Sequence, residues 1–159
     1  MSTLTFRPIT EADRDFLIAV YASTRADEIA LVNWGDEQKA SFLEGQFSAQ
    51  HQYYQQHYTN TDFLIILSND NQIGRLYIAR WPNEIRIVDL ALLPEFRNLG
   101  YGSKILKDVL AEATKAVKSV TIHVERFNPA RNLYQRLGFV KKGEHGIYDL
   151  MEWSTALSV

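Results

Sequence analysis

The residues best suited to chemistry in this chain form a short glycine-containing stretch, Arg97 to Ser103. It follows an apolar, strand-like run over residues 85–93 and precedes an amphipathic helix pattern over residues 100–117. The first turn of a helix carries backbone N–H groups without internal partners, so a phosphate is bound well there. Gly100 and Gly102 lack the Cβ atoms that would keep a ligand away from these amides. The stretch therefore predicts a site for a phosphate-bearing, nucleotide-type ligand.

Two familiar nucleotide loops do not fit this spacing. A dinucleotide-binding G-x-G-x-x-G motif would need a third glycine where Ile105 stands. A P-loop, G-x-x-x-x-G-K-[ST], is longer than the stretch from Gly100 to Lys104 allows. A helix that begins after a glycine turn and binds nothing stays an alternative, because short glycine patterns are common.

A second motif follows the first at a fixed distance. The first reads Arg97-x-x-Gly100-x-Gly102, and the second runs from Asn128 to Phe139 as N-P-A-R-N-L-Y-Q-R-L-G-F. Together they resemble the R/Q-x-x-G-x-G/A pyrophosphate loop and the N-x-A-x-x-L-Y-x-x-x-G-F segment of the GNAT superfamily of acetyl-coenzyme A-dependent N-acetyltransferases. The resemblance covers residues 62–153 and implies an α/β (α+β) fold. Its mixed, mostly antiparallel, splayed central sheet would be flanked by helices on both faces.

The resemblance also implies where acetyl-CoA binds. In the family, the strands ending near Leu92 and Glu125 splay apart, and backbone groups exposed there pair with the pantetheine arm. Asn128 would contact the same arm, although an Asn before a helix that starts at Pro129 is also an ordinary N-cap. The expected coenzyme-binding residues are Leu90, Ala91, Leu92, Arg97, Asn98, Leu99, Gly100, Tyr101, Gly102, Ser103 and Asn128.

Acetyl transfer to an amine needs a base, an oxyanion donor and an acid for the leaving thiolate. Tyr134 matches the tyrosine that serves as the acid in the resembled family, and its alternative role is that of a buried core aromatic. The N–H of Leu92 is the expected oxyanion donor. Glu84 matches a glutamate used as the base by some family members, and a solvated strand-end carboxylate is its alternative role. The other candidate bases are Asp89, His123, Glu125 and Glu28.

The chain contains no cysteine. A cysteine acyl-enzyme is therefore excluded, and the amine would attack the thioester directly in a ternary complex. Disulfides and thiolate metal sites are excluded as well. The four histidines do not show metal-ligand spacing, so we expect no metal.

Length and composition indicate the number of domains and the classes of partner that we expect. With 159 residues, of which 46% are hydrophobic, the chain can form one domain over residues 1–159. A net charge of -2 argues against a nucleic-acid interface, and no apolar run is long enough for a membrane span. We expect a cytoplasmic protein. The last strand, Ile147 to Trp153, could extend a sheet across a homodimer.

Hydrophobic periodicity predicts the elements that position these residues. Thr10 to Asp13 resembles a capping box at the start of a first helix, and residues 36–58 predict a second, aromatic-rich helix or helix pair with a core-facing side. Asn69 to Asn71 predicts a hairpin turn. The expected strands are 3–7, 62–68, 72–79, 84–93, 119–125, 138–142 and 146–153, and the later helices are 100–117 and 129–137.

The expected function is transfer of an acetyl group from acetyl-CoA to a primary amine of a small molecule or peptide. The alternative is a non-catalytic acyl-CoA-binding sensor or regulatory module. Four carboxylates and three aromatic residues could form an acidic pocket for a cationic amine, or could serve solubility and packing alone. They are Asp27, Glu28, Asp36, Glu37, Trp34, Tyr53 and Tyr54.

Overall fold

The computed structural model describes residues 3–154. Over these residues the strands are hydrogen-bonded in the order β1-β2-β3-β4-β5-β7-β6 in one sheet of seven strands. The β4–β5 pair is parallel, whereas β1–β2, β5–β7 and β6–β7 are antiparallel. The predicted mixed, mostly antiparallel sheet is therefore confirmed. By its internal contacts the chain forms two compact units, Met1–Leu76 with Ala91–Arg97 and Tyr77–Leu90 with Asn98–Val159.

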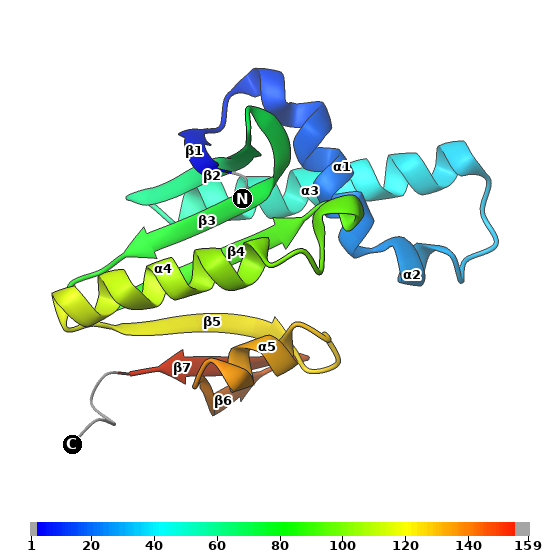
Figure 1. Cartoon of the computed structure of the whole chain (residues 1–159). Helices are drawn as coiled ribbons and strands as arrows, with labels where there is room; N and C mark the ends of the chain where they lie inside the picture. Colours follow the sequence, from blue (N-terminus) through cyan, green and yellow to red (C-terminus); the bar gives the residue numbers. More distant parts are fainter. Residues whose placement is uncertain (1–2, 155–159) are drawn as a thin grey trace. The chain divides into compact units, whose positions relative to one another are not determined.

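The first unit combines an antiparallel strand pair and part of a third strand with three α-helices and two 3-10 helices. Its elements are β1 (Leu4–Pro8), the 3-10 helix η1 (Glu11–Asp13), α1 (Arg14–Thr24), α2 (Ala26–Ile29), α3 (Asp36–His57), β2 (Thr61–Ser68), the first part of β3 (Asn71–Arg80) and the 3-10 helix η2 (Pro94–Phe96). Figure 1 shows α1 and α3 packed against each other in this unit. Their buried side chains meet β2 in one apolar cluster of Leu17, Tyr21, Leu43, Phe47 and Ile65.

A buried aspartate fixes the start of α1. The carboxylate of Asp13 accepts hydrogen bonds of 2.8 Å from the Thr10 N–H and from both terminal nitrogens of Arg7. Gln72 Nε2 donates a further hydrogen bond of 3.1 Å to it. The Arg7 guanidinium holds the pKa of Asp13 well below its usual range. The predicted capping box is confirmed.

The second unit contains β4 (Glu84–Leu92) up to Leu90, α4 (Tyr101–Ala116), β5 (Ser119–Glu125), α5 (Arg131–Arg136), β6 (Val140–His145) and β7 (Tyr148–Trp153). In Figure 1, α4 runs alongside β5, and β7 lies between β5 and β6. The apolar face of α4 buries Ile105, Leu106, Val109 and Ala113. The spacing of these residues is the one that predicts the helix in the sequence.

The structure differs from the sequence prediction mainly between α1 and β2. One helix, α3 (Asp36–His57), forms there, which is the first of the two predicted alternatives, and its buried side ends at Phe47. Tyr54 and Tyr58 are only half-buried, so the expectation of a core-facing side fails beyond that residue. The four-residue α2 was not predicted, because it has no room for a helical repeat. Within residues 3–154, no helix is both long and apolar enough to cross a membrane.

Candidate active site

The glycine turn before α4 has the backbone conformation that a phosphate loop requires. Asn98 and Gly100 both have positive φ values, 60° and 91°, and Gly100 is the N-cap of α4. Gly100 accepts the first helical hydrogen bond, 3.0 Å from the Lys104 N–H, and no side chain caps the helix. The first-turn N–H groups of a helix point outward along its axis and carry the positive end of its dipole. The predicted loop residues Asn98, Leu99, Gly100, Tyr101, Gly102 and Ser103 therefore form a turn and helix start able to bind an anion.

In the second unit, β4 and β5 stop pairing before either strand ends. The parallel ladder joins Glu84–Ile87 to Ser119–Ile122. In the described residues, β4 continues to Leu90 within this unit and β5 continues to Glu125 without further ladder pairs between them. An early end of this ladder agrees with the divergence of these strands that the family resemblance implies.

The end of β4 belongs to the first unit and has one edge held by β3. The N–H of Leu93 donates to the carbonyl oxygen of Ile73 at 2.9 Å. Peptide groups alternate between the two edges of a strand, so the N–H and C=O of Leu92 point away from β3. Arg97 Nε donates to that Leu92 carbonyl at 2.9 Å, and its Nη2 donates to Ser23 Oγ at 3.1 Å. The predicted loop arginine is thus fixed to the strand end and to the last turn of α1.

Tyr134 is buried on α5, with 5% of its surface exposed. Its ring packs on Phe139 with 5.7 Å between centroids. Burial, followed by the negative charge of Asp89, raises the pKa of Tyr134 to about 12. The phenol therefore keeps its proton at neutral pH and is a hydrogen-bond donor.

Glu84, the first predicted base, lies at the other end of the same strand. Its Oε2 accepts a hydrogen bond of 2.6 Å from Thr121 Oγ1, and Arg86 Nη2 lies 3.5 Å from it. At about 3.3 Å per residue, Glu84 is about 16 Å along β4 from Asp89. Of these two carboxylates, it is Asp89 whose negative charge contributes to the raised pKa of Tyr134.

The other predicted polar residues have local partners. Asn128 Oδ1 accepts the Ala130 N–H at 2.9 Å, which makes it a cap of the turn before α5. His123 is exposed, and burial of part of its ring, with Arg86 and His145 nearby, lowers its pKa. Glu28 pairs with Arg25 at 3.2 Å on the surface.

The proposed acidic, aromatic pocket is not assembled. Trp34 packs on Phe42, with 5.2 Å between ring centroids, near the start of α3. Tyr53 stacks on His57 at 4.2 Å near the end of that helix. With about 1.5 Å of rise per residue, Phe42 and Tyr53 are about 16 Å apart, so the structure does not bring these aromatic groups together.

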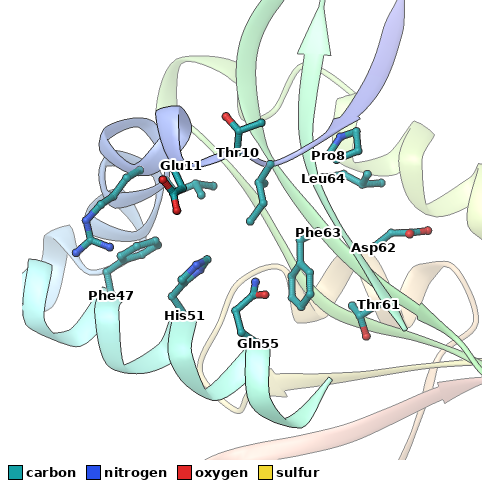
Figure 2. A pocket seen from close by; sticks show the side chains of 13 residues that line it. Pro8, Thr10, Glu11, Phe47, His51, Gln55, Thr61, Asp62, Phe63 and Leu64 are labelled. Carbon is teal, nitrogen blue, oxygen red and sulfur yellow. The ribbon is translucent and has the colours of Figure 1, made fainter. Parts of the chain in front are cut away.

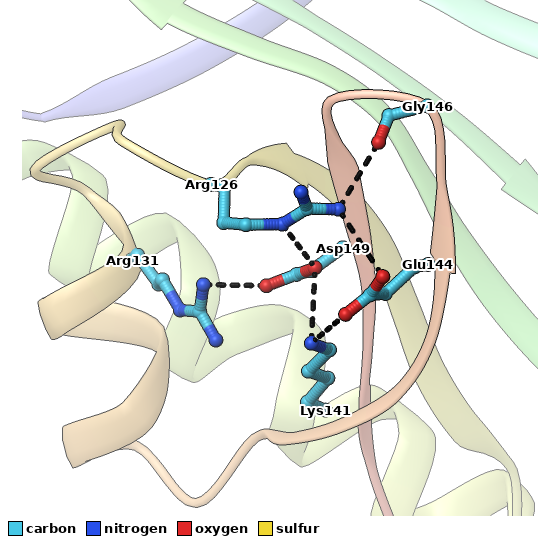
Figure 3. Close-up of polar contacts among 6 residues, drawn as sticks. All are labelled: Arg126, Arg131, Lys141, Glu144, Gly146 and Asp149. Carbon is cyan, nitrogen blue, oxygen red and sulfur yellow. Dashed lines mark hydrogen bonds and ion pairs between the residues drawn. The ribbon is translucent and has the colours of Figure 1, made fainter.

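Sequence reasoning missed a charged cluster centred on Asp149, which is fully buried in β7. Figure 3 shows cations from three other segments around its carboxylate. Arg131 Nη1 lies 2.5 Å from Asp149 Oδ2, while Arg126 Nε and Lys141 Nζ lie 3.1 and 3.5 Å from Oδ1. Glu144 pairs with both Arg126 and Lys141. The clue in the sequence is that Asp149 falls in the same alternation as the buried Met151.

This cluster anchors the helix that carries Tyr134. Arg131 is the first residue of α5 and Tyr134 lies one turn later, on the same side of the helix. A helix of six residues has little stability of its own, so its placement depends on such tertiary contacts. The Asp149–Arg131 pair therefore ties the Tyr134 helix to the β7 strand.

Comparison with known proteins identifies the family. The model of the acetyltransferase (GNAT) family matches residues 29–139. This chain belongs to the GNAT family of acetyltransferases. It is 26% identical over 104 residues to the [ribosomal protein bS18]-alanine N-acetyltransferase of Haemophilus influenzae, a match that covers 65% of this chain and 69% of that protein.

Solved structures of GNAT enzymes share the fold. The PaiA N-acetyltransferase of Thermoplasma acidophilum, in complex with coenzyme A, superposes with a TM-score of 0.69 at 19% identity, covering 96% of this chain and 99% of that one. A GNAT acetyltransferase of Elizabethkingia anophelis with acetyl-CoA bound gives a TM-score of 0.57 at 19% identity, covering 95% and 97%. GNAT relatives thus bind coenzyme A and acetyl-CoA, and this GNAT enzyme has the N-acetyltransferase activity of its family.

Proposed function

We propose that this GNAT enzyme transfers the acetyl group of acetyl-CoA directly to a primary amine within a ternary complex. The observation that carries the proposal is the buried, protonated phenol of Tyr134 under the influence of the Asp89 carboxylate. Amine acetylation requires a proton donor for the leaving thiolate and a proton acceptor for the amine. A module that only bound acyl-CoA would need neither, and the family match also supports the enzyme.

The coenzyme would be held by main-chain groups. We assign its pyrophosphate to the outward N–H groups at the start of α4, from Gly100 to Ser103, with Arg97 and the exposed Asn98 and Leu99 beside them. The pantetheine arm would pair with the outward edge of β4 at Leu90 and Leu92, would pass alongside Ala91, and would reach Asn128. These assignments are supported by the left-handed Gly100 and by the early end of the β4–β5 ladder. In this proposal residues 1–159 act as one catalytic domain.

A carboxylate and Tyr134 can accept and donate the protons that this reaction requires. The acceptor ammonium loses a proton to a carboxylate, and its nitrogen then attacks the thioester carbonyl carbon. The C–N bond forms, the C–S bond breaks, and the departing sulfur takes the proton of Tyr134. The nitrogen of the new amide then loses its second proton, which restores the Tyr134 phenol through solvent, and the carboxylate releases the first proton to solvent. The N–H of Leu92 would stabilise the negative charge that develops on the carbonyl oxygen.

We propose Asp89 as the carboxylate that accepts the amine proton, with Glu84 as the alternative. Asp89 acts electrostatically on Tyr134, and Glu84 lies about 16 Å from Asp89 along β4. A base and an acid must both reach the same reacting atoms, which favours the residue near Tyr134.

Thiol release tests the function directly. Because the chain has no cysteine, free thiol formed from acetyl-CoA can be measured without background from the protein. A panel of primary amines should contain at least one that supports steady thiol release and is recovered acetylated. Saturable binding of coenzyme A without turnover on any amine of a broad panel would favour the non-catalytic module.

A further inference from the structure

The first unit contains a pocket that the acetylation site does not use. Its volume is about 890 Å³, within the range of small-molecule sites. It is bounded by the end of β1, the start of α1, the second half of α3 and the first half of β2. Figure 2 shows these segments around a space into which side chains from α3 project.

One wall of the pocket is formed by a row of side chains on one side of α3. Phe47, His51 and Gln55 follow each other at helical spacing and line the same side. The His51 ring stacks on Phe47, with 5.4 Å between centroids and 18° between planes. Phe63 of β2 lines another part of the pocket, and Phe47 is buried beneath His51, so the aromatic surfaces open to a ligand are those of His51 and Phe63.

His51 presents an unpaired polar atom in this wall. Its Nδ1 is buried and has no hydrogen-bond partner within residues 3–154. Burial and the charges of Arg14 and Arg75 lower the pKa of the ring. A neutral imidazole has one nitrogen that can accept a hydrogen bond, and a buried polar atom without a partner calls for one. A ligand in the pocket could supply it.

The charges around the pocket favour a cation. Arg14 lies over the Phe47 ring at 5.6 Å, but it donates to Ser48 Oγ at 2.7 Å and pairs with Glu44 at 3.6 Å. Its guanidinium therefore already has two polar partners. Glu11 is exposed at the rim and forms no ion pair within the described residues, and Figure 2 shows its carboxylate directed toward the Phe47 side of the pocket.

We propose that this pocket binds a small amine that carries an aromatic ring with a hydroxyl-type substituent. The ring would lie against Phe63, its hydroxyl would donate to His51 Nδ1, and the ammonium would pair with Glu11. The site is separate from acetyl transfer, and binding here requires neither acetyl-CoA nor Tyr134.

Calorimetric titration in the absence of acetyl-CoA tests the site, with tyramine as the probe. Tyramine should bind saturably and about tenfold more tightly than 4-hydroxyphenylacetate, which replaces the ammonium with a carboxylate. Glu11→Gln should weaken tyramine binding about tenfold. Asp15→Asn removes a nearby exposed charge outside the pocket and should change affinity less than about twofold.

A second comparison isolates His51. The wild-type chain should prefer tyramine to phenethylamine, which lacks the hydroxyl, and His51→Phe should remove that preference while keeping the aromatic wall. Since the measurement is a ratio between two ligands, it stays informative if the variant is less stable. Absence of saturable tyramine binding, equal affinity in Glu11→Gln, or an unchanged ligand preference in His51→Phe would each overturn the proposal.

Discussion

Asp89 acts on Tyr134 through its negative charge, which adds to burial in raising the pKa of the phenol to about 12. The two side chains come from β4 and α5, which are far apart in the sequence. Tyr134 belongs to the family motif that runs from Asn128 to Phe139, and the structure adds that the charge of Asp89 acts on its phenol. This effect is also the reason why we propose Asp89 before Glu84 as the base, a choice that the sequence alone leaves open.

Tyr134→Phe should lower kcat for thiol release by about 100-fold, since it removes a general acid and keeps the buried ring. The affinity for coenzyme A should stay within about twofold, because its proposed contacts are main-chain groups elsewhere. Tyr53→Phe on the exposed side of α3 is the matched control and should be neutral. Unchanged turnover in Tyr134→Phe would remove the assigned acid.

Asp89→Asn should lower kcat/KM by about 100-fold, whereas Glu84→Gln on the same strand should stay within about threefold of wild type. Asp89→Asn should also lower the pKa of Tyr134, because the charge that helps to raise it is gone. Tyrosinate absorbance during alkaline titration, compared with the Tyr134→Phe background, measures this shift. The reverse ranking of the two variants would make Glu84 the base.

Gly100 and Gly35 form a matched pair for the coenzyme turn. Both are helix N-caps, and an added Cβ would meet nothing within 4 Å at either position. Only Gly100 has a positive φ, 91°, against -69° for Gly35. Gly100→Ala should therefore strain the turn by about 1–2 kcal/mol and weaken coenzyme A binding about tenfold.

Gly35→Ala should leave the affinity for coenzyme A unchanged. Equal affinities of both glycine variants and wild type, measured by calorimetry, would show that the left-handed turn does not hold the coenzyme.

The two buried aspartates should dominate acid unfolding. Arg7 lowers the pKa of Asp13, and Arg126, Arg131 and Lys141 together lower that of Asp149 against the opposing effect of burial. A carboxyl with a lowered folded-state pKa stabilises the fold above its ordinary pKa near ~4, and this contribution is lost as pH falls through the folded-state value. The free energy of unfolding should therefore decrease below about pH 4.

Asp13→Asn should lower the free energy of unfolding at pH 7 by about 3 kcal/mol and flatten its decrease in acid. Asp149→Asn should destabilise in the same direction and, in addition, reduce kcat, because the Arg131 anchor of the Tyr134 helix is weakened. Urea unfolding from pH 7 to pH 3 measures the first effect. Equal kcat in the two variants would deny Asp149 a role in positioning Tyr134.

The parts of the fold that follow local rules were predictable from the sequence. The capping box at Thr10, the hairpin turn at Asn69 and the helix after Gly100 were all located within a few residues. Each has a local cause, namely a cap, a left-handed turn or a repeat of apolar residues. The family motif likewise lies within contiguous residues.

The features of the structure that the sequence analysis predicted wrongly or did not find depend on tertiary contacts. Tyr54 and Tyr58 continue the helical spacing of α3 beyond Phe47, yet they are only half-buried, and His51 and Gln55 line a pocket instead of the core. The coupling of Asp89 to Tyr134 and of Asp149 to Arg131 joins residues separated in the chain. No local pattern reports such pairs, so the choice of base required the structure.

A crystal structure of this GNAT enzyme with acetyl-CoA tests the central claim most directly. The account predicts that the pyrophosphate lies on the N–H groups from Gly100 to Ser103 and that the thioester sulfur lies within hydrogen-bond reach of the Tyr134 hydroxyl. An unoccupied turn, with the coenzyme bound elsewhere on the chain, would contradict it.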